Sequence, residues 1–232
     1  MRDEVAAAGG PDPAVVVANL ADLRAVDRLA DDVAALTPRL DVLVNNAGVG
    51  FGAPDAPREM SENGIELRFA VNYLAARLLA RRLLPLLTAS APARIVNVAS
   101  AGQAPLDFAD PTTERGYSGV LAYCRSKLAM VMDTFDLADE LRHRGVTANA
   151  LHPATFMATT MVHAAGTSPL NTVDTGGDAV LRLIDDPSLE GVTGRYFDVQ
   201  DEARANDEAY DAEARAKLRA VADELTAKAL GG

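Results

Sequence analysis

The sequence predicts a single α/β domain, residues 1–232, built on a doubly wound and mostly parallel sheet. Three observations predict this class. The chain has 232 residues, of which 49% are hydrophobic and 24% charged, so it can fill one substantial core and is too apolar for a disordered chain. Short aliphatic runs alternate with longer amphipathic segments, as in strand–helix–strand units. The runs are mostly apolar rather than cleanly alternating, as expected of strands covered by helices on both faces.

Each element follows from this pattern in chain order. The aliphatic runs predict strands at residues 14–18, 40–44, 94–98 and 146–151, and a last strand is expected at 195–199, after a weaker helix near 174–185. The amphipathic segments predict helices near residues 22–36, 60–87, 119–143, 174–185 and 211–229. Because the chain has neither an internal repeat nor a low-complexity linker, we assign these elements to one domain.

Charge and composition exclude several classes of function. The formal net charge is −11 and the pI is about 4.7, so the surface repels nucleic acid and anionic membranes. The single cysteine, Cys124, cannot form an internal disulfide, and no spacing typical of a metal site is present. We find no signal peptide and no aliphatic stretch long enough to span a membrane, and we therefore expect a cytoplasmic protein without a metal ion.

The most specific motif joins Tyr123 and Lys127, which lie four residues apart on a predicted helix and therefore on one face of it. A phenol with a pKa near 10 is a poor acid at neutral pH, and a cation close by lowers its pKa by roughly 1 to 3 units. This pair predicts a general acid/base. Taken alone, the same spacing also occurs by chance on many amphipathic helices.

Ser100 follows the predicted strand at residues 94–98, at a carboxyl end, where open α/β sheets bind ligands. Its hydroxyl could hydrogen-bond a substrate oxygen as charge develops there. The alternative is a serine that caps a helix or stabilises a turn.

Two asparagine motifs complete the set. The residues Asn45, Asn46, Ala47 and Gly48 follow the strand at 40–44, and Gly48 would allow the backbone to approach a ligand closely. Asn72 lies in the middle of a predicted helix, where asparagine is mildly unfavourable, so it indicates a local kink or a bound water. An ordinary turn and a solvent-facing asparagine are the respective alternatives.

In this order the motifs resemble the short-chain dehydrogenase/reductase family, whose N-N-A-G, helix asparagine, serine and Y-x-x-x-K they match. The resemblance implies a Rossmann-like fold and direct hydride transfer between a nicotinamide cofactor and a carbonyl or alcohol. It implies that Tyr123 is the general acid/base and that Ser100 polarises the substrate oxygen. It further implies that Lys127 lowers the tyrosine pKa and holds the nicotinamide ribose, and that Asn72 anchors a proton-relay water.

The cofactor implied by the resemblance is NAD or NADP. Asn19 and Leu20 match the family's pair at the adenine, and Pro153 and Thr155 belong to the loop beside the nicotinamide, where Ala154 replaces the usual glycine. The full set of implied cofactor contacts is Asn19, Leu20, Asn45, Ala47, Gly48, Tyr123, Lys127, Pro153 and Thr155.

The resemblance begins near residue 15. The family opens with a strand, a T-G-x-x-x-G-x-G turn, a helix and a second strand, whereas the only N-terminal glycines here, Gly9 and Gly10, precede Pro11. We therefore expect the sequence to be N-terminally truncated, either by a start codon assigned too late or by loss from the gene. Because that segment would distinguish the two cofactors, the choice between NAD and NADP stays open.

The segments at residues 123–130 and 194–198 look most like the retinol-dehydrogenase-like and protochlorophyllide-reductase-like branch of the family. Bulky apolar residues in the loop at 155–171 favour a hydrophobic substrate. A leucine stripe in the helix at 60–87 leads us to expect a homo-oligomer, since in this family that helix often pairs between copies. Two alternatives are an inactive fragment or pseudo-enzyme that only associates with other subunits, and a sugar-nucleotide epimerase or dehydratase.

Overall fold

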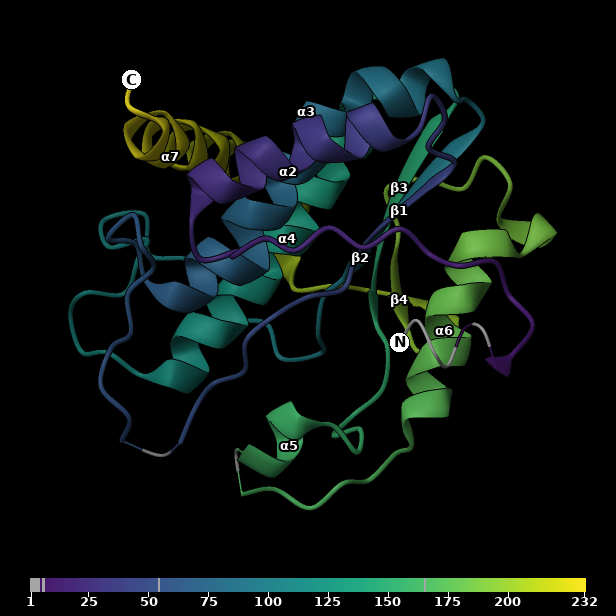
Figure 1. Ribbon diagram of the computed structural model, residues 1–232. Coiled ribbons are helices and arrows are strands. Elements are labelled where there is room, and N and C mark those ends of the chain that lie inside the picture. Colours follow the sequence, from purple (N-terminus) through teal and green to yellow (C-terminus); the bar gives the residue numbers. More distant parts are fainter. Residues whose placement is uncertain (1–4, 6, 54, 165) are drawn as a thin grey trace.

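A five-stranded sheet runs through the middle of the computed structural model, which describes residues 5, 7–53, 55–164 and 166–232 (Figure 1). The strands stand in the order β1-β2-β3-β4-β5, parallel except for the antiparallel β5. They span β1 Val42–Asn45, β2 Ala93–Val98, β3 Val146–His152, β4 Tyr196–Asp198 and β5 Asp201–Ala203. The fold class and four of the predicted strands are confirmed.

Helices cover both faces of this sheet, as the apolar character of the strands predicts. They span α2 Leu23–Leu36, α3 Ala76–Ala89, α4 Gly119–Glu140, α5 Thr160–Ala164, α6 Val173–Asp185 and α7 Ala212–Leu230. Ile95 of β2 points into a core formed with α2, α3 and α4, whereas its neighbour Val96 points into a core formed with α6. Successive strand residues thus pack against the helices on opposite faces of the sheet, because side chains alternate along a strand.

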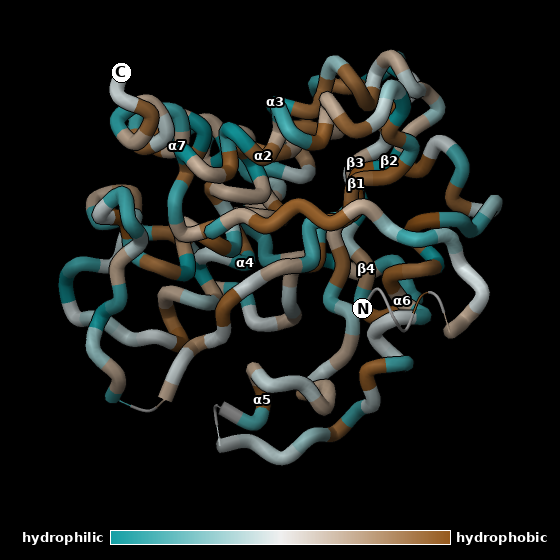
Figure 2. Tube along the Cα trace, viewed as in Figure 1, coloured by the Kyte–Doolittle hydropathy of each residue, from teal (hydrophilic) through white to brown (hydrophobic). Residues whose placement is uncertain are grey.

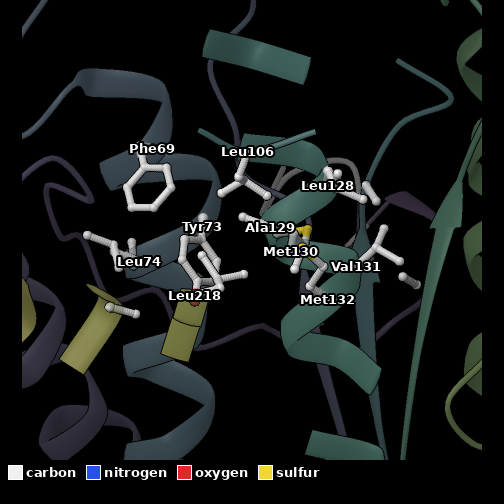
Figure 3. Close-up of a cluster of buried hydrophobic side chains, with 14 of the residues drawn as sticks. Phe69, Tyr73, Leu74, Leu106, Leu128, Ala129, Met130, Val131, Met132 and Leu218 are labelled. Atoms are coloured by element: carbon white, nitrogen blue, oxygen red, sulfur yellow. The ribbon is translucent and has the colours of Figure 1, made fainter. Parts of the chain in front are cut away.

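The C-terminal helix α7 closes the core on the side of α4. Figure 3 shows Leu218 of α7 beside Tyr73 and Leu74, near Met132 of α4. The leucine stripe predicted on the long helix is buried within the chain at Leu74, Leu78, Leu83 and Leu87. The pairing of this helix between two copies of the chain stays a prediction.

The predicted strand at residues 14–18 is wrong. This stretch is extended but forms no strand in the described structure, and Val15 and Val17 are 55% and 91% exposed. Figure 2 shows it as a hydrophobic stretch of the trace ahead of α2. The physical reason is that β-propensity measures how well side chains pack on neighbouring strands, and no described strand pairs with this stretch.

Two further elements differ from the sequence-based expectation. The helix expected from residue 60 begins near residue 67, because a tight turn at Gly64 (φ +73°) brings Ser61 N to within 2.7 Å of the Ile65 carbonyl oxygen. Strand β5 was not expected. It follows a two-residue turn in which Val199 has φ +56°, a conformation that is rare for a β-branched residue.

Within the described part of the chain, no helix is both long enough and apolar enough to cross a bilayer.

Candidate active site

A cavity of about 660 Å³ opens at the carboxyl ends of β1, β2 and β3. Parallel strands present their carboxyl ends on one edge of the sheet, and ligands of open α/β sheets bind there. The predicted site residues that line it are Ala47, Gly48, Ser100, Tyr123, Lys127, Pro153 and Thr155. The structure thus brings together, around one cavity, residues from loops and a helix that are more than 100 positions apart.

Tyr123 and Ser100 bring a phenol and a hydroxyl to this cavity. Burial raises the pKa of Tyr123, and its hydrogen bond with the Ser100 side chain acts in the opposite direction. The Ser100 Oγ also accepts a hydrogen bond of 3.0 Å from Gly102 N. The serine hydroxyl is therefore fixed by its own loop while it remains in contact with the phenol.

Lys127 is buried one helical turn after Tyr123, with its Nζ 5.8 Å from the centre of the tyrosine ring. The Nζ donates a hydrogen bond of 2.8 Å to the carbonyl oxygen of Val98. Burial lowers the pKa of Lys127 to about 8. The cation therefore stands near the phenol, and its predicted effect on the tyrosine pKa stays a prediction.

Asn72 lies at the centre of a π-helix, Phe69–Ala75, that precedes α3. A π-helix carries one residue more per turn than an α-helix and often marks a functional site, so the expected local irregularity is present. The side chain is fully buried, accepts a hydrogen bond of 2.8 Å from Val49 N, and donates to Ser126 Oγ at 3.0 Å. Asn72 thus joins the loop after β1 to α4.

Gly48 packs tightly where this loop meets the site. A Cβ at this position would lie 3.1 Å from Asn72 Oδ1 and 3.5 Å from Lys127 Nζ. A side chain here would therefore press on Asn72 and touch Lys127. The predicted close approach of this backbone to a ligand stays a prediction.

Asn45 does not face the cavity. It is buried, and its Nδ2 donates a hydrogen bond of 2.8 Å to Asn97 Oδ1 on β2. Asn46, the second residue of the motif, lines the cavity instead. The reason is strand geometry: Asn45 is the last residue of β1, and its side chain is used to cross-link the sheet.

The residues predicted at the adenine also lie outside the main cavity. The Asn19 side chain accepts a hydrogen bond of 3.0 Å from Ala21 N, as in a turn before a helix. Leu20 lines a smaller cavity of about 130 Å³ together with Asn46 and Ala47. The two cavities therefore meet at the loop after β1.

Pro153 and Thr155 follow β3 on the opposite wall. The Thr155 Oγ1 lies 3.0 Å from Nε2 of the buried His152. Burial lowers the pKa of His152, so this imidazole is neutral at pH 7 and its contact with the threonine is a neutral hydrogen bond. His152 thereby fixes the loop at which a nicotinamide is expected.

Phe51 is a lining residue that the sequence reasoning missed. Its ring stands edge-on to that of Tyr123, with 5.9 Å between the ring centres and 81° between the planes. The segment is held by the buried Arg68, whose Nε donates a hydrogen bond of 2.9 Å to the Gly50 carbonyl oxygen, and by contact with Gly119. The sequence feature that could have identified this lining residue is the presence of an aromatic residue shortly after the N-N-A-G motif.

The far wall and the mouth of the cavity are apolar. Its lining residues from the loop after β3 and from α5 include Phe156, Met157, Met161 and Val162. These are the bulky residues that led us to expect a hydrophobic substrate.

The chain is similar in sequence to known short-chain dehydrogenases. Residues 1–169 match the family described as short chain dehydrogenase. Mouse retinol dehydrogenase 14 is 35% identical over 218 residues, which cover 85% of this chain and 64% of that protein. Thus the chain spans less than two thirds of the length of this relative.

Solved structures agree in fold. An uncharacterised protein from Mycobacterium paratuberculosis superposes with a TM-score of 0.73 at 26% identity, covering 97% of this chain and 79% of that one. The NADP complex of RhlG from Pseudomonas aeruginosa superposes with a TM-score of 0.65 at 25% identity, covering 85% of this chain and 79% of that one.

Proposed function

The chain belongs to the short-chain dehydrogenase family, and from this membership and the cavity we propose that it is an NAD(P)-dependent oxidoreductase. The proposed reaction interconverts a carbonyl compound and the corresponding alcohol. The single observation that carries the proposal is the convergence of Ser100, Tyr123 and Lys127 on one cavity at the carboxyl edge of the sheet.

The residues at the inner end of the cavity fit the nicotinamide half of such a cofactor. Asn46, Ala47 and Gly48 form a loop close to the Lys127 ammonium, which could donate hydrogen bonds to ribose hydroxyls. Pro153 and Thr155 form the opposite wall. The RhlG complex, with NADP, supports use of NAD or NADP here.

Gly9 and Gly10 supply no pyrophosphate site in the described structure. Gly10 N donates a hydrogen bond of 2.9 Å to the Val5 carbonyl oxygen, so the two glycines end a helical turn. A turn between a strand and a helix, which would aim backbone amides at a phosphate, is a different arrangement. We assign only the nicotinamide half to this part of the chain.

The side chains can perform the proton transfer. When bound, the reduced nicotinamide supplies the hydride that the carbonyl carbon accepts. Ser100 donates a hydrogen bond to the carbonyl oxygen and stabilises the negative charge that develops there. Tyr123 then gives its proton to that oxygen, and the positive charge of Lys127 favours the phenolate that remains. Oxidation of the alcohol runs through the same contacts in reverse.

We propose a hydrophobic substrate. The wall formed by Phe51, Phe156, Met157 and Met161 would remove apolar surface from water and offers few polar partners to a sugar. The mouse relative is named for retinol, an apolar alcohol, which agrees with this substrate class.

The test compares Tyr123→Phe with Tyr210→Phe in the full product of the gene. Decanal and cinnamaldehyde serve as apolar carbonyl probes with NADH or NADPH, and oxidation of the reduced nicotinamide is followed by absorbance. Tyr123→Phe should lower kcat by about 10²- to 10⁴-fold, the usual effect of losing a general acid. Tyr210, 42% exposed and outside the cavity lining, should be replaceable with little change. Retention of more than about a tenth of the wild-type rate in Tyr123→Phe would refute the assignment.

A further inference from the structure

The carbonyl oxygen of Ser100 accepts hydrogen bonds from two side chains that the proposed reaction does not use. Tyr196 of β4 donates its hydroxyl at 3.1 Å, and Gln103 donates its Nε2 at 2.9 Å. A carbonyl oxygen has two lone pairs, so both acceptor positions of Ser100 are occupied. One of the donors is 96 residues away in the chain.

The other atoms of this segment are fixed as well. Ala99 N donates to the Leu151 carbonyl oxygen of β3 at 2.8 Å, and Gly102 N donates to Ser100 Oγ. With the Val98–Ala99 peptide tied to β3 and the Ser100–Ala101 peptide tied to Tyr196, the backbone around Ser100 has little rotational freedom. The position of its Cβ, and with it the Oγ that Gly102 N contacts, then depends on the orientation of its own carbonyl group.

The loop that follows Ser100 is also hydrogen-bonded to the C-terminal segment. Gln103 Oε1 accepts a hydrogen bond of 2.8 Å from Asn206 N, and Leu106 N donates to Glu208 Oε2 at 2.8 Å. Ala205 and Ala209, on either side of these partners, are buried. The segment after β5 therefore supports the serine loop from behind, away from the cavity lining.

We propose that Tyr196 and Gln103 are positioning residues that hold the Ser100 hydroxyl in its catalytic orientation through the Ser100 main-chain carbonyl. This proposal rests on the proposed function. Tyr196 is 4% exposed, and burial raises its pKa, so its phenol stays protonated and remains a hydrogen-bond donor over the whole working range of pH. A donor that never ionises suits a fixed support and does not suit a proton-transfer role.

The first test is Tyr196→Phe, which removes one oxygen atom and keeps the buried ring. Small displacements of a reacting group lower rates strongly, and we expect kcat for decanal reduction to fall about tenfold. Affinity for NADH or NADPH, measured by cofactor fluorescence, should stay within about twofold of wild type. The ionisation of Tyr123 seen in the pH profile of kcat should move to higher pH, because the Ser100 hydrogen bond lowers the pKa of Tyr123.

Two further variants separate positioning from stability. Gln103→Glu keeps the oxygen that accepts from Asn206 N and removes the donor to Ser100, so it should lower kcat in the same way if Tyr196→Phe does not fold. Tyr210→Phe is the matched control: its hydroxyl accepts a hydrogen bond from Ala205 N in the same C-terminal segment and makes no contact with Ser100. It should leave kcat and the pH profile unchanged.

The decisive comparison is made in a Ser100→Ala background. If Tyr196 acts through Ser100, Tyr196→Phe should cause no further loss of kcat once the serine hydroxyl is gone. An equal fractional loss in both backgrounds would overturn the proposal, as would a wild-type kcat in Tyr196→Phe. Full activity of Ser100→Ala alone would instead remove the serine from the proposed function, and the positioning role with it.

Discussion

Replacing Lys127 with Met should make the protein more stable and inactive at the same time. Burial lowers the lysine pKa from 10.5 to about 8, so holding the ammonium in the fold costs about 3 kcal/mol at neutral pH, at about 1.4 kcal/mol for each pKa unit. Met fills a similar volume without a charge. It also removes the hydrogen bond to the Val98 carbonyl oxygen, which is worth about 1–2 kcal/mol when that group is buried. We expect a net gain of about 1–2 kcal/mol in the free energy of unfolding.

The direction of the lysine pKa shift predicts how the stability difference changes with pH. A base whose pKa is lower in the folded than in the unfolded state destabilises the fold fully below the folded pKa of about 8, and this effect disappears as pH rises towards 10.5. The advantage of Lys127→Met should therefore be greatest near pH 7 and shrink between pH 8 and 10.5. Urea unfolding of the cofactor-free protein at several pH values measures it, with the exposed Lys228→Met as control. A variant less stable than wild type at pH 7, or a difference that does not change with pH, would refute the reasoning.

Three other substitutions test packing and a buried ion pair. Gly119→Ala would place a Cβ 2.2 Å from the Phe51 carbonyl oxygen. We therefore expect it to displace the loop that carries Phe51, to destabilise the fold by about 1–3 kcal/mol and to raise KM for apolar substrates. Gly177→Ala, with open space around it, should instead stabilise α6 by about 0.5–1 kcal/mol in thermal unfolding. Arg77→Leu should cost about 3–5 kcal/mol in urea unfolding, because it leaves the buried Asp133 carboxylate without its 2.8 Å partner. Burial raises the pKa of Asp133, so this loss should diminish as pH falls and the carboxylate is protonated; a loss that does not depend on pH would show that the ion pair is not its cause.

The elements that the sequence predicted well are those whose residues carry their own local pattern. Strand β2 and strand β3 are buried on both faces and appear as short aliphatic runs, while α2 has a strong apolar stripe and an aspartate at its N-cap, Asp22. The stretch at 14–18 has the same aliphatic pattern and fails as a strand, because pairing requires a neighbour that a local pattern does not supply.

The site was predictable where residue type alone decides the chemistry. Ser100, Tyr123 and Lys127 each combine a reactive group with a place at a strand end or on one helix face. The sequence could not show whether Asn45 or its neighbour Asn46 faces the cavity, since adjacent residues at a strand end point to opposite sides.

Residues that act through tertiary contacts leave little local pattern from which their partner could be predicted. Phe51 reaches Tyr123 because Gly50 is held by Arg68, and Tyr196 reaches Ser100 because β4 follows β3 in the sheet. Each of these contacts joins segments far apart in sequence. They become visible only when the order of the strands is known.

The π-helix at residues 69–75 positions two sets of side chains at once. Upstream of α3 it aims Asn72 at the loop after β1, and downstream it sets the rotation at which Leu78 and Leu83 enter the core. Deleting one residue would restore ordinary α-helical turns and leave the rotation of α3 nearly unchanged, because a π-helix takes about one residue more to turn through the same angle. The leucines would stay in the core, but Asn72 would lose the wide turn that aims it at the loop after β1. The length of this segment is therefore constrained more tightly than its composition, and an insertion or deletion here would be expected to do more damage than most single substitutions.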